Sequence, residues 1–172
     1  MKKFVLFALI AAPPYSPGSD CPTSLPRAVR KEISRAVGWS VLSADMLPDD
    51  DAAIWREAHK GLCPGSVAGR FTDREAISYV VALVKRNPDS TYLERVLAFP
   101  AGSDETSPTV LIPSARVISP FVVWKVPPGR YRGVDGGSVL IRWESFVYEK
   151  IESVATQYYW LGGRFHSFQT AE

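Results

Sequence analysis

The chain holds few residues that could act as a nucleophile, a general base or a metal ligand. Its only histidines are His59 and His166, and neither stands in a familiar catalytic motif. The sequence contains no Gly-x-Ser-x-Gly, His-Glu-x-x-His or Walker motif. A hydrolase that uses two carboxylates needs no short motif, and Glu144 with Glu152 is the pair we consider for such a site.

The two cysteines, Cys21 and Cys63, are the next candidates for chemistry. In an oxidising compartment an isolated pair is most simply a disulfide, and paired cysteines cannot act as nucleophiles. The competing interpretation is a metal site of Cys21, His59, Cys63 and a carboxylate, but a paired-cysteine motif is lacking. We predict the Cys21–Cys63 disulfide, with no metal and no cofactor.

Two polar segments could hold ions. Asp49, Asp50 and Asp51 could bind calcium, but no glycine-punctuated ligand loop follows them, and they also suit the positive end of a helix dipole. The glycine-rich segment 130–137 could hold an anion, but it does not lead into a helix as phosphate loops do. We interpret the first as a helix start and the second as an exposed connector.

The beginning of the chain predicts export. Met1-Lys2-Lys3 precedes the apolar run 4–12, the pattern of a signal peptide, and this run is too short to span a bilayer. A buried N-terminal strand is the alternative. We place a signal peptide at residues 1–18 and a single globular α+β domain at residues 19–172. The mature protein is then periplasmic or secreted, without a stable membrane anchor after cleavage.

Composition limits the class of partner. The 20 basic residues include Lys2 and Lys3, so 20 − 2 = 18 basic residues face 18 acidic ones in the mature chain. Nucleic-acid binding normally needs a basic face, so we expect no nucleic-acid partner. The content of 46% hydrophobic and 22% charged residues is typical of a globular protein.

Hydrophobic periodicity predicts two helices near the N-terminus. Leu25, Val29, Ile33 and Val37 recur every four residues, which indicates an amphipathic helix over 26–37 whose other face is cationic. A second helix begins at Pro48 and can end at Gly61.

Strands follow the helices. The apolar, β-branched run 77–84 predicts a central strand covered on both faces, and residues 92–99 predict its antiparallel partner. Further strands are expected at 109–112, 121–126 and 139–147, the last alternating between apolar and polar residues. The sequence thus predicts an α+β fold, with two N-terminal helices packed on a mostly antiparallel sheet of about six strands.

The C-terminal segment predicts a hairpin. Gly162-Gly163 separates two aromatic-rich runs, and glycine reaches the positive φ that a two-residue hairpin turn needs. In this register Leu161 faces Arg164, Trp160 faces Phe165, Tyr159 faces His166 and Tyr158 faces Ser167. Both faces carry aromatic residues, so one packs on a core and the other is partly covered or open to a partner.

One segment resembles a known family. Residues 65–73 look like the glycine, phenylalanine and aspartate entry of secreted FG-GAP or VCBS-like segments, and residues 159–165 resemble the end of small uncharacterised exported bacterial proteins with one such segment. In that family the following loop often binds calcium. Here Asp73 and Glu75 remain and the glycine is absent. The resemblance implies a calcium-stabilised module as a third interpretation, and a single copy excludes a propeller made from this chain alone.

The sequence as a whole favours an exported, non-catalytic protein-binding module, such as an inhibitor or immunity-type protein, whose partner is another protein of the cell envelope. Aromatic residues and arginines make good interface anchors. The residues predicted to form the surface are Arg130, Tyr131, Arg132, Tyr159, Arg164 and His166. The alternative is a small envelope-polymer hydrolase using paired carboxylates.

Overall fold

The computed structural model describes residues 21, 25–72, 76–100 and 107–170. The predicted α+β architecture is wrong: strands make up 47% and helices 15% of the structure, the strands form several antiparallel sheets, and a strand separates the two helices. The strands outnumber the prediction because short segments such as Ser66–Gly69 and Gly129–Arg132 also pair with neighbouring strands.

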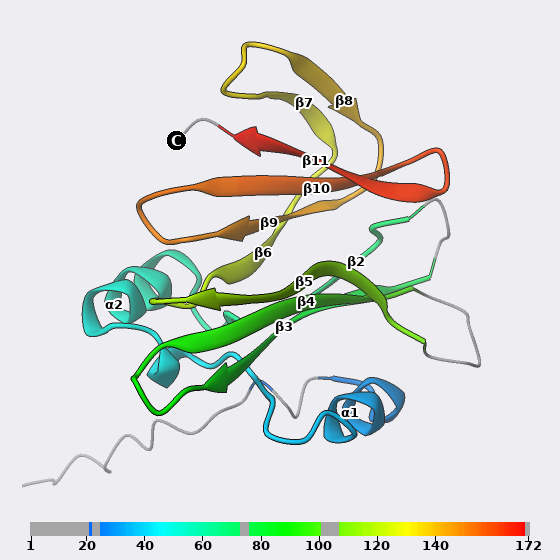
Figure 1. Ribbon diagram of the computed structural model, residues 1–172. Coiled ribbons are helices and arrows are strands. Elements are labelled where there is room, and N and C mark those ends of the chain that lie inside the picture. The colour runs from blue at the N-terminus through cyan, green and yellow to red at the C-terminus, as the bar shows by residue number, and fades with distance from the viewer. Residues whose placement is uncertain (1–20, 22–24, 73–75, 101–106, 171–172) are drawn as a thin grey trace, which may run out of the picture.

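Two sheets form two facing layers (Figure 1). The first has the order β1-β3-β4-β5, with β2 also paired to β3. The second has the order β11-β10-β9-β6. The strands of the first sheet are β1 Ser40–Val41, β2 Ser66–Gly69, β3 Ser78–Arg86, β4 Tyr92–Phe99 and β5 Thr109–Val117, and those of the second are β6 Val122–Val126, β9 Ser145–Glu149, β10 Ala155–Leu161 and β11 Arg164–Thr170.

Two further strands, β7 Gly129–Arg132 and β8 Ser138–Ile141, form a two-stranded ribbon beyond the second sheet (Figure 1). Residues 130–137, expected to be a connector, thus include most of β7 and the turn to β8. The strand expected over 139–147 is also divided, because β8 ends at Ile141 and β9 begins at Ser145. The break lets the chain leave the ribbon and enter the second sheet.

The helices take different positions. α1 (Arg27–Ser34) covers the outer face of the first sheet, where Leu25 and Val29 pack with Val81 and Leu83. Val37, predicted to lie on the apolar side, is 88% exposed because the helix ends before it. After a 3-10 turn, η1 (Ala44–Met46), α2 (Asp49–Ala58) stands at one end of the two layers rather than on a sheet face (Figure 1).

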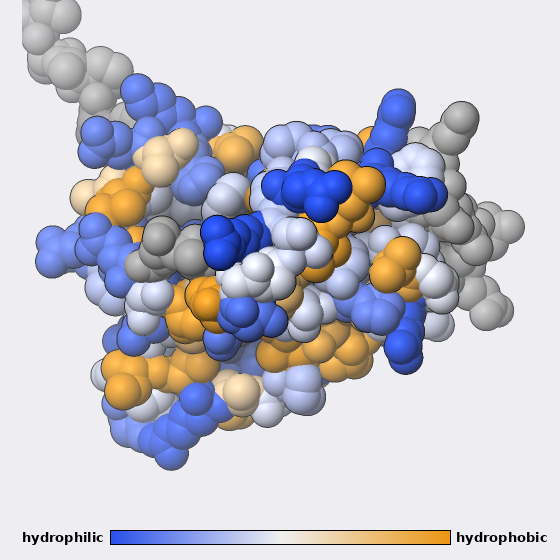
Figure 2. All heavy atoms as spheres, turned by 90° about the horizontal axis from the view of Figure 1, so that it is seen from above, coloured by the Kyte–Doolittle hydropathy of each residue, from blue (hydrophilic) through white to orange (hydrophobic). Residues whose placement is uncertain are grey.

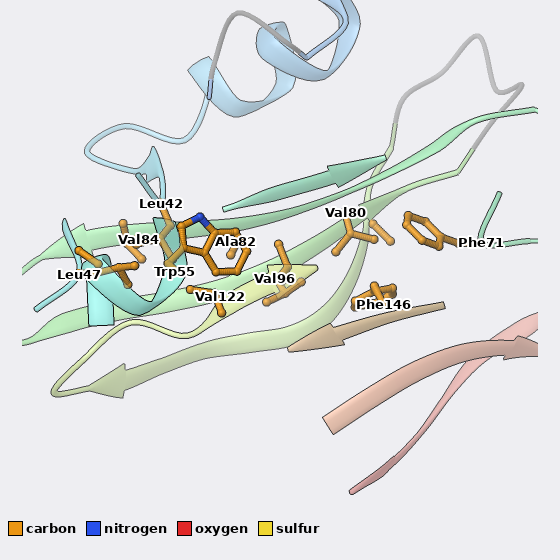
Figure 3. Packing of buried hydrophobic residues seen from close by; sticks show 13 residues of the cluster. Leu42, Leu47, Trp55, Phe71, Val80, Ala82, Val84, Val96, Val122 and Phe146 are labelled. Carbon is orange, nitrogen blue, oxygen red and sulfur yellow. The ribbon is translucent and has the colours of Figure 1, made fainter. Parts of the chain in front are cut away.

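The main core lies between the sheets. Trp55 of α2 fills one end of it, and Phe71 with Phe146 fills the other (Figure 3). Alternate residues of β3 enter this core and the second core under α1, so Val80 belongs to one and Val81 to the other. The prediction of a central strand covered on both faces is therefore confirmed.

The disulfide between Cys21 and Cys63 is confirmed, with Cα atoms 5.1 Å apart. It joins the segment before α1 to the segment after α2 and agrees with an oxidising compartment. The proposed signal peptide, residues 1–18, lies outside the described residues. Within the described part of the chain, no helix has the length and apolar character needed to cross a membrane.

Candidate functional site

The β7–β8 ribbon presents a cationic face. Arg130 lies opposite Leu140 and Arg132 lies opposite Ser138, so these four side chains share one face of the ribbon. Arg130 and Arg132 are exposed, and Leu140 is 59% exposed. Neither arginine forms an ion pair with a described residue. The ribbon therefore offers two unpaired guanidinium groups around an apolar side chain.

Tyr131 occupies the other face of the ribbon. Its hydroxyl donates a hydrogen bond to the carbonyl of Pro127 at 2.5 Å, and its ring packs against a small core of Val126, Val147 and Ala155. Partial desolvation raises the pKa of Tyr131. This tyrosine holds the ribbon against the second sheet, so its neighbours Arg130 and Arg132 are the residues of this segment that face outward.

The other predicted site residues lie on the β10–β11 hairpin. Its register is the one predicted, with Tyr159 opposite His166 and Leu161 opposite Arg164. The rings of Tyr159 and His166 stack with centroids 5.7 Å apart, and Arg164 Nε donates a hydrogen bond to His166 Nε2 at 3.3 Å. These three residues therefore form one patch.

The structure separates this patch from the arginines of the ribbon. Gly133, next to Arg132, pairs with Thr170 at the far end of β11. Arg164 begins the same strand, so the two groups lie roughly 20 Å apart along it. The six predicted residues thus divide into a ribbon patch and a hairpin patch.

A cleft of about 440 Å³ opens between the edges of the two sheets. Residues 109–111 of β5 form one wall, and residues 163–167 of the turn and β11 form the other. Tyr158 and Trp160 of β10 also line it, as does Phe165. The described lining residues include no carboxylate, but they do include Arg164 and His166.

Glu94 is a functional candidate that our sequence analysis missed. Only 1% of it is exposed, and its carboxylate accepts a hydrogen bond from the Phe121 amide at 3.1 Å. Burial raises the pKa of Glu94 to about 8, although hydrogen bonds from Phe121 and Tyr148 oppose the shift. A signal was present, since Glu94 alternates with Val96 and Ala98, which enter the core between the sheets.

The carboxylates considered for a hydrolase do not meet. Glu144 precedes β9 and Glu152 lies in the turn after it, so the length of the strand separates them. Glu144 forms an ion pair with Lys125 at 2.8 Å and accepts a hydrogen bond from the Arg70 amide at 2.7 Å. These partners outweigh partial desolvation and lower the pKa of Glu144. The arrangement stabilises a charged carboxylate that joins β6 to the segment after β2.

His59 has a packing role. Its ring stacks on Trp55 at 4.1 Å and lies 5.5 Å from Trp124, and desolvation lowers its pKa. Because Cys21 and Cys63 are bonded to each other, they cannot join His59 in a metal site of thiolates. The ring instead connects α2 with β6.

The segments considered for calcium divide between described and undescribed residues. Asp49, Asp50 and Asp51 form the first turn of α2, and Asp51 accepts a hydrogen bond from Ser119. In the segment that resembles FG-GAP or VCBS entries, Phe71 is fully buried, whereas Asp73 and Glu75 lie outside the described residues. Across the ranges that the structure covers, no group of three or more potential metal ligands occurs.

The face that carries the ribbon is mixed in character. Figure 2 shows apolar patches separated by strongly hydrophilic residues across this side of the molecule. Such a surface suits binding through several anchors rather than through one continuous apolar contact.

Comparison with protein-family models, with curated protein sequences and with solved structures gave no match.

Proposed function

We propose that the protein is an exported, non-catalytic protein-binding module, of the inhibitor or immunity type, that acts in the periplasm or outside the cell. The observation that carries this proposal is the β7–β8 ribbon, which lies beyond the second sheet (Figure 1). Arg130, Arg132 and Leu140 are exposed and share one face of this ribbon. An inhibitor that enters a cleft needs such a projecting element. The disulfide supports the assignment to an oxidising compartment.

The character of the ribbon suggests the partner. Exposed guanidinium groups without ion-pair partners in the described structure are ready to bind carboxylates, and arginine does so in bidentate geometry. Leu140, directly opposite Arg130, adds an apolar contact between the charges. We therefore expect an envelope protein with an acidic cleft that has an apolar floor.

The alternative of a carboxylate hydrolase has weaker support. A hydrolase of this type needs one carboxyl group on each side of the bond that it cleaves, with the two groups about 5–10 Å apart. Glu144 and Glu152 lie at opposite ends of β9, and the described residues that line the cleft between the sheets include no carboxylate. Neither feature supplies the acid and base that the chemistry requires.

The test is capture of a partner from envelope extract by the chain from Ser19 onward, analysed by mass spectrometry. The ribbon variant is Arg130→Glu/Arg132→Glu. The control is Arg27→Glu/Arg30→Glu, which makes the same charge change at two exposed arginines of α1. We expect the wild type and the control to capture the same protein stoichiometrically, and the ribbon variant to lose it.

Salt provides a second test of the same proposal. Raising the ionic strength should weaken capture, because the arginines of the ribbon are exposed and their attraction to carboxylates is screened. Equal capture by the ribbon variant and the α1 variant would show that the ribbon is not the binding element. A wild-type chain that captures nothing would contradict the binding function itself.

A further inference from the structure

The two layers are joined along one side and open along the other. On the joined side, the amide of Val123 in β6 donates a hydrogen bond to the carbonyl of Pro64, just before β2, at 2.8 Å. On the other side, β5 and β11 are the outermost strands of their sheets, and the cleft of about 440 Å³ lies between them. In the described structure, β11 pairs only with β10, apart from the single bridge at Thr170.

The two outer strands differ in their ability to accept another strand. Pro113 lies within β5, and the pairing of β5 with β4 shifts on both sides of Val96. Proline and bulges are the features with which proteins protect sheet edges against pairing. β11 has no proline, and its pairing with β10 runs without interruption from Arg164 to Thr170. β11 is therefore the edge that remains able to pair.

The direction of the backbone groups of β11 follows from one hydrogen bond. The carbonyl of Gln169 accepts a hydrogen bond from the amide of Val134 at 3.1 Å, so the polar groups of Gln169 point away from β10. Because this direction alternates along an antiparallel strand, Ser167 and Phe165 point the same way. Both residues line the cleft. Their amide and carbonyl groups thus form a row of strand-pairing sites on its wall.

The side chains around the cleft indicate the chemistry of the occupant. Trp160 Nε1 is a buried donor without an acceptor among the described residues. Arg164 forms no ion pair with a described residue, and none of the described residues that line the cleft is a carboxylate. A buried donor normally has an acceptor, and an unpaired arginine attracts an anion. Phe165 and Tyr158 supply the apolar part of the lining.

From these observations we propose that the cleft binds an extended peptide segment that adds as a strand to β11 and places a carboxylate, next to an apolar side chain, near Arg164, in the cleft that Trp160 also lines. In this mode backbone hydrogen bonds supply affinity, and pockets for alternate side chains supply specificity. The site is separate from the arginine face of the ribbon and does not depend on it. One chain can therefore contact a folded partner with the ribbon and hold an extended segment at the sheet edge.

The test is an NMR titration of the full mature chain with a short peptide of alternating valine and threonine that has a free C-terminal carboxylate. We expect the amide signals of Phe165 and Ser167 and the indole N–H signal of Trp160 to shift together. The same peptide with a C-terminal amide should bind about tenfold more weakly, because it lacks the charge. The same peptide N-methylated at alternate residues should not bind, because it cannot pair as a strand.

Arg164→Glu should weaken binding of the carboxylate peptide to a similar extent, whereas Arg27→Glu, at an exposed position of α1, should leave it unchanged. Peptide binding that is insensitive to the carboxylate, to N-methylation or to Arg164→Glu would overturn the proposal, as would the absence of any shift at β11. Self-association of the chain that Ser167→Pro abolishes would also overturn it, because a second copy would then occupy the edge.

Discussion

Glu94 makes the stability of this protein depend on pH. In the unfolded chain its carboxyl ionises near pH 4.5, whereas burial raises the folded-state pKa to about 8. Between these values the unfolded state releases a proton that the folded state retains, so the free energy of unfolding falls as pH rises. The full effect is at most on the order of 5 kcal/mol. Urea unfolding should therefore show a less stable protein at pH 8 than at pH 5.

Glu94→Gln should remove most of this difference, because the amide stays neutral at both pH values and its oxygen can still accept the hydrogen bond from the Phe121 amide. Glu152→Gln, at an exposed turn residue, is the matched control and should keep the pH dependence of the wild type. If Glu94→Gln and the wild type lose equal stability between pH 5 and pH 8, another group is responsible.

Residues that could do chemistry are easier to identify from the sequence than the side chains that surround them in the fold. Cys21 and Cys63 could be paired correctly because the chain offers no other cysteine. The alternation of Glu94 with Val96 and Ala98 was overlooked because Leu97 and Phe99 make the other face of β4 apolar as well. Tyr131 was expected on the binding surface with Arg130 and Arg132, but a strand directs successive side chains to opposite faces.

The turn of the β10–β11 hairpin depends on its two glycines. Gly162 and Gly163 have φ values of 59° and 84°, and a Cβ on either would meet no atom within 4 Å. Replacement therefore costs only backbone strain, about 1–2 kcal/mol for an ordinary L residue. Gly163→Val should lower the free energy of unfolding by about this amount. Gly163→Asn should lower it less, since asparagine tolerates the left-handed region, and chemical denaturation measures both.

Equal losses in the valine and asparagine variants would show that space, rather than backbone conformation, limits this position.

The hairpin is also the element predicted best, because its register depends on a two-residue turn and on alternation, which are local. Strand β7 was missed because it has only four residues and leads into the glycine-rich turn before β8. The division of the strands between two sheets depends on contacts between distant segments, which periodicity does not encode.

The disulfide contributes at the scale of the whole molecule. It closes a loop with a sequence separation of 42 residues, for which the chain-entropy model gives about 4 kcal/mol. The Cys21→Ala/Cys63→Ala variant should lose stability of this order in chemical denaturation. Reducing agent should destabilise the wild type to the same extent and leave the variant unchanged. A variant as stable as the oxidised wild type would show that α1 is held by its core contacts alone.

The order of the two sheets along the chain has a further consequence. All strands of the first sheet precede Ile118, which is 86% exposed, and all strands of the second sheet follow it. Cutting after Ile118 would therefore give two fragments, each with one complete sheet and one bare apolar face. Val96 of the first sheet and Phe146 of the second are buried in the core between the sheets. Each would become exposed to solvent if the other fragment were removed. Each fragment alone should be largely unfolded, and mixing the two should restore the tryptophan fluorescence of the intact protein, so the chain should behave as a pair of complementary halves suitable for a split reporter.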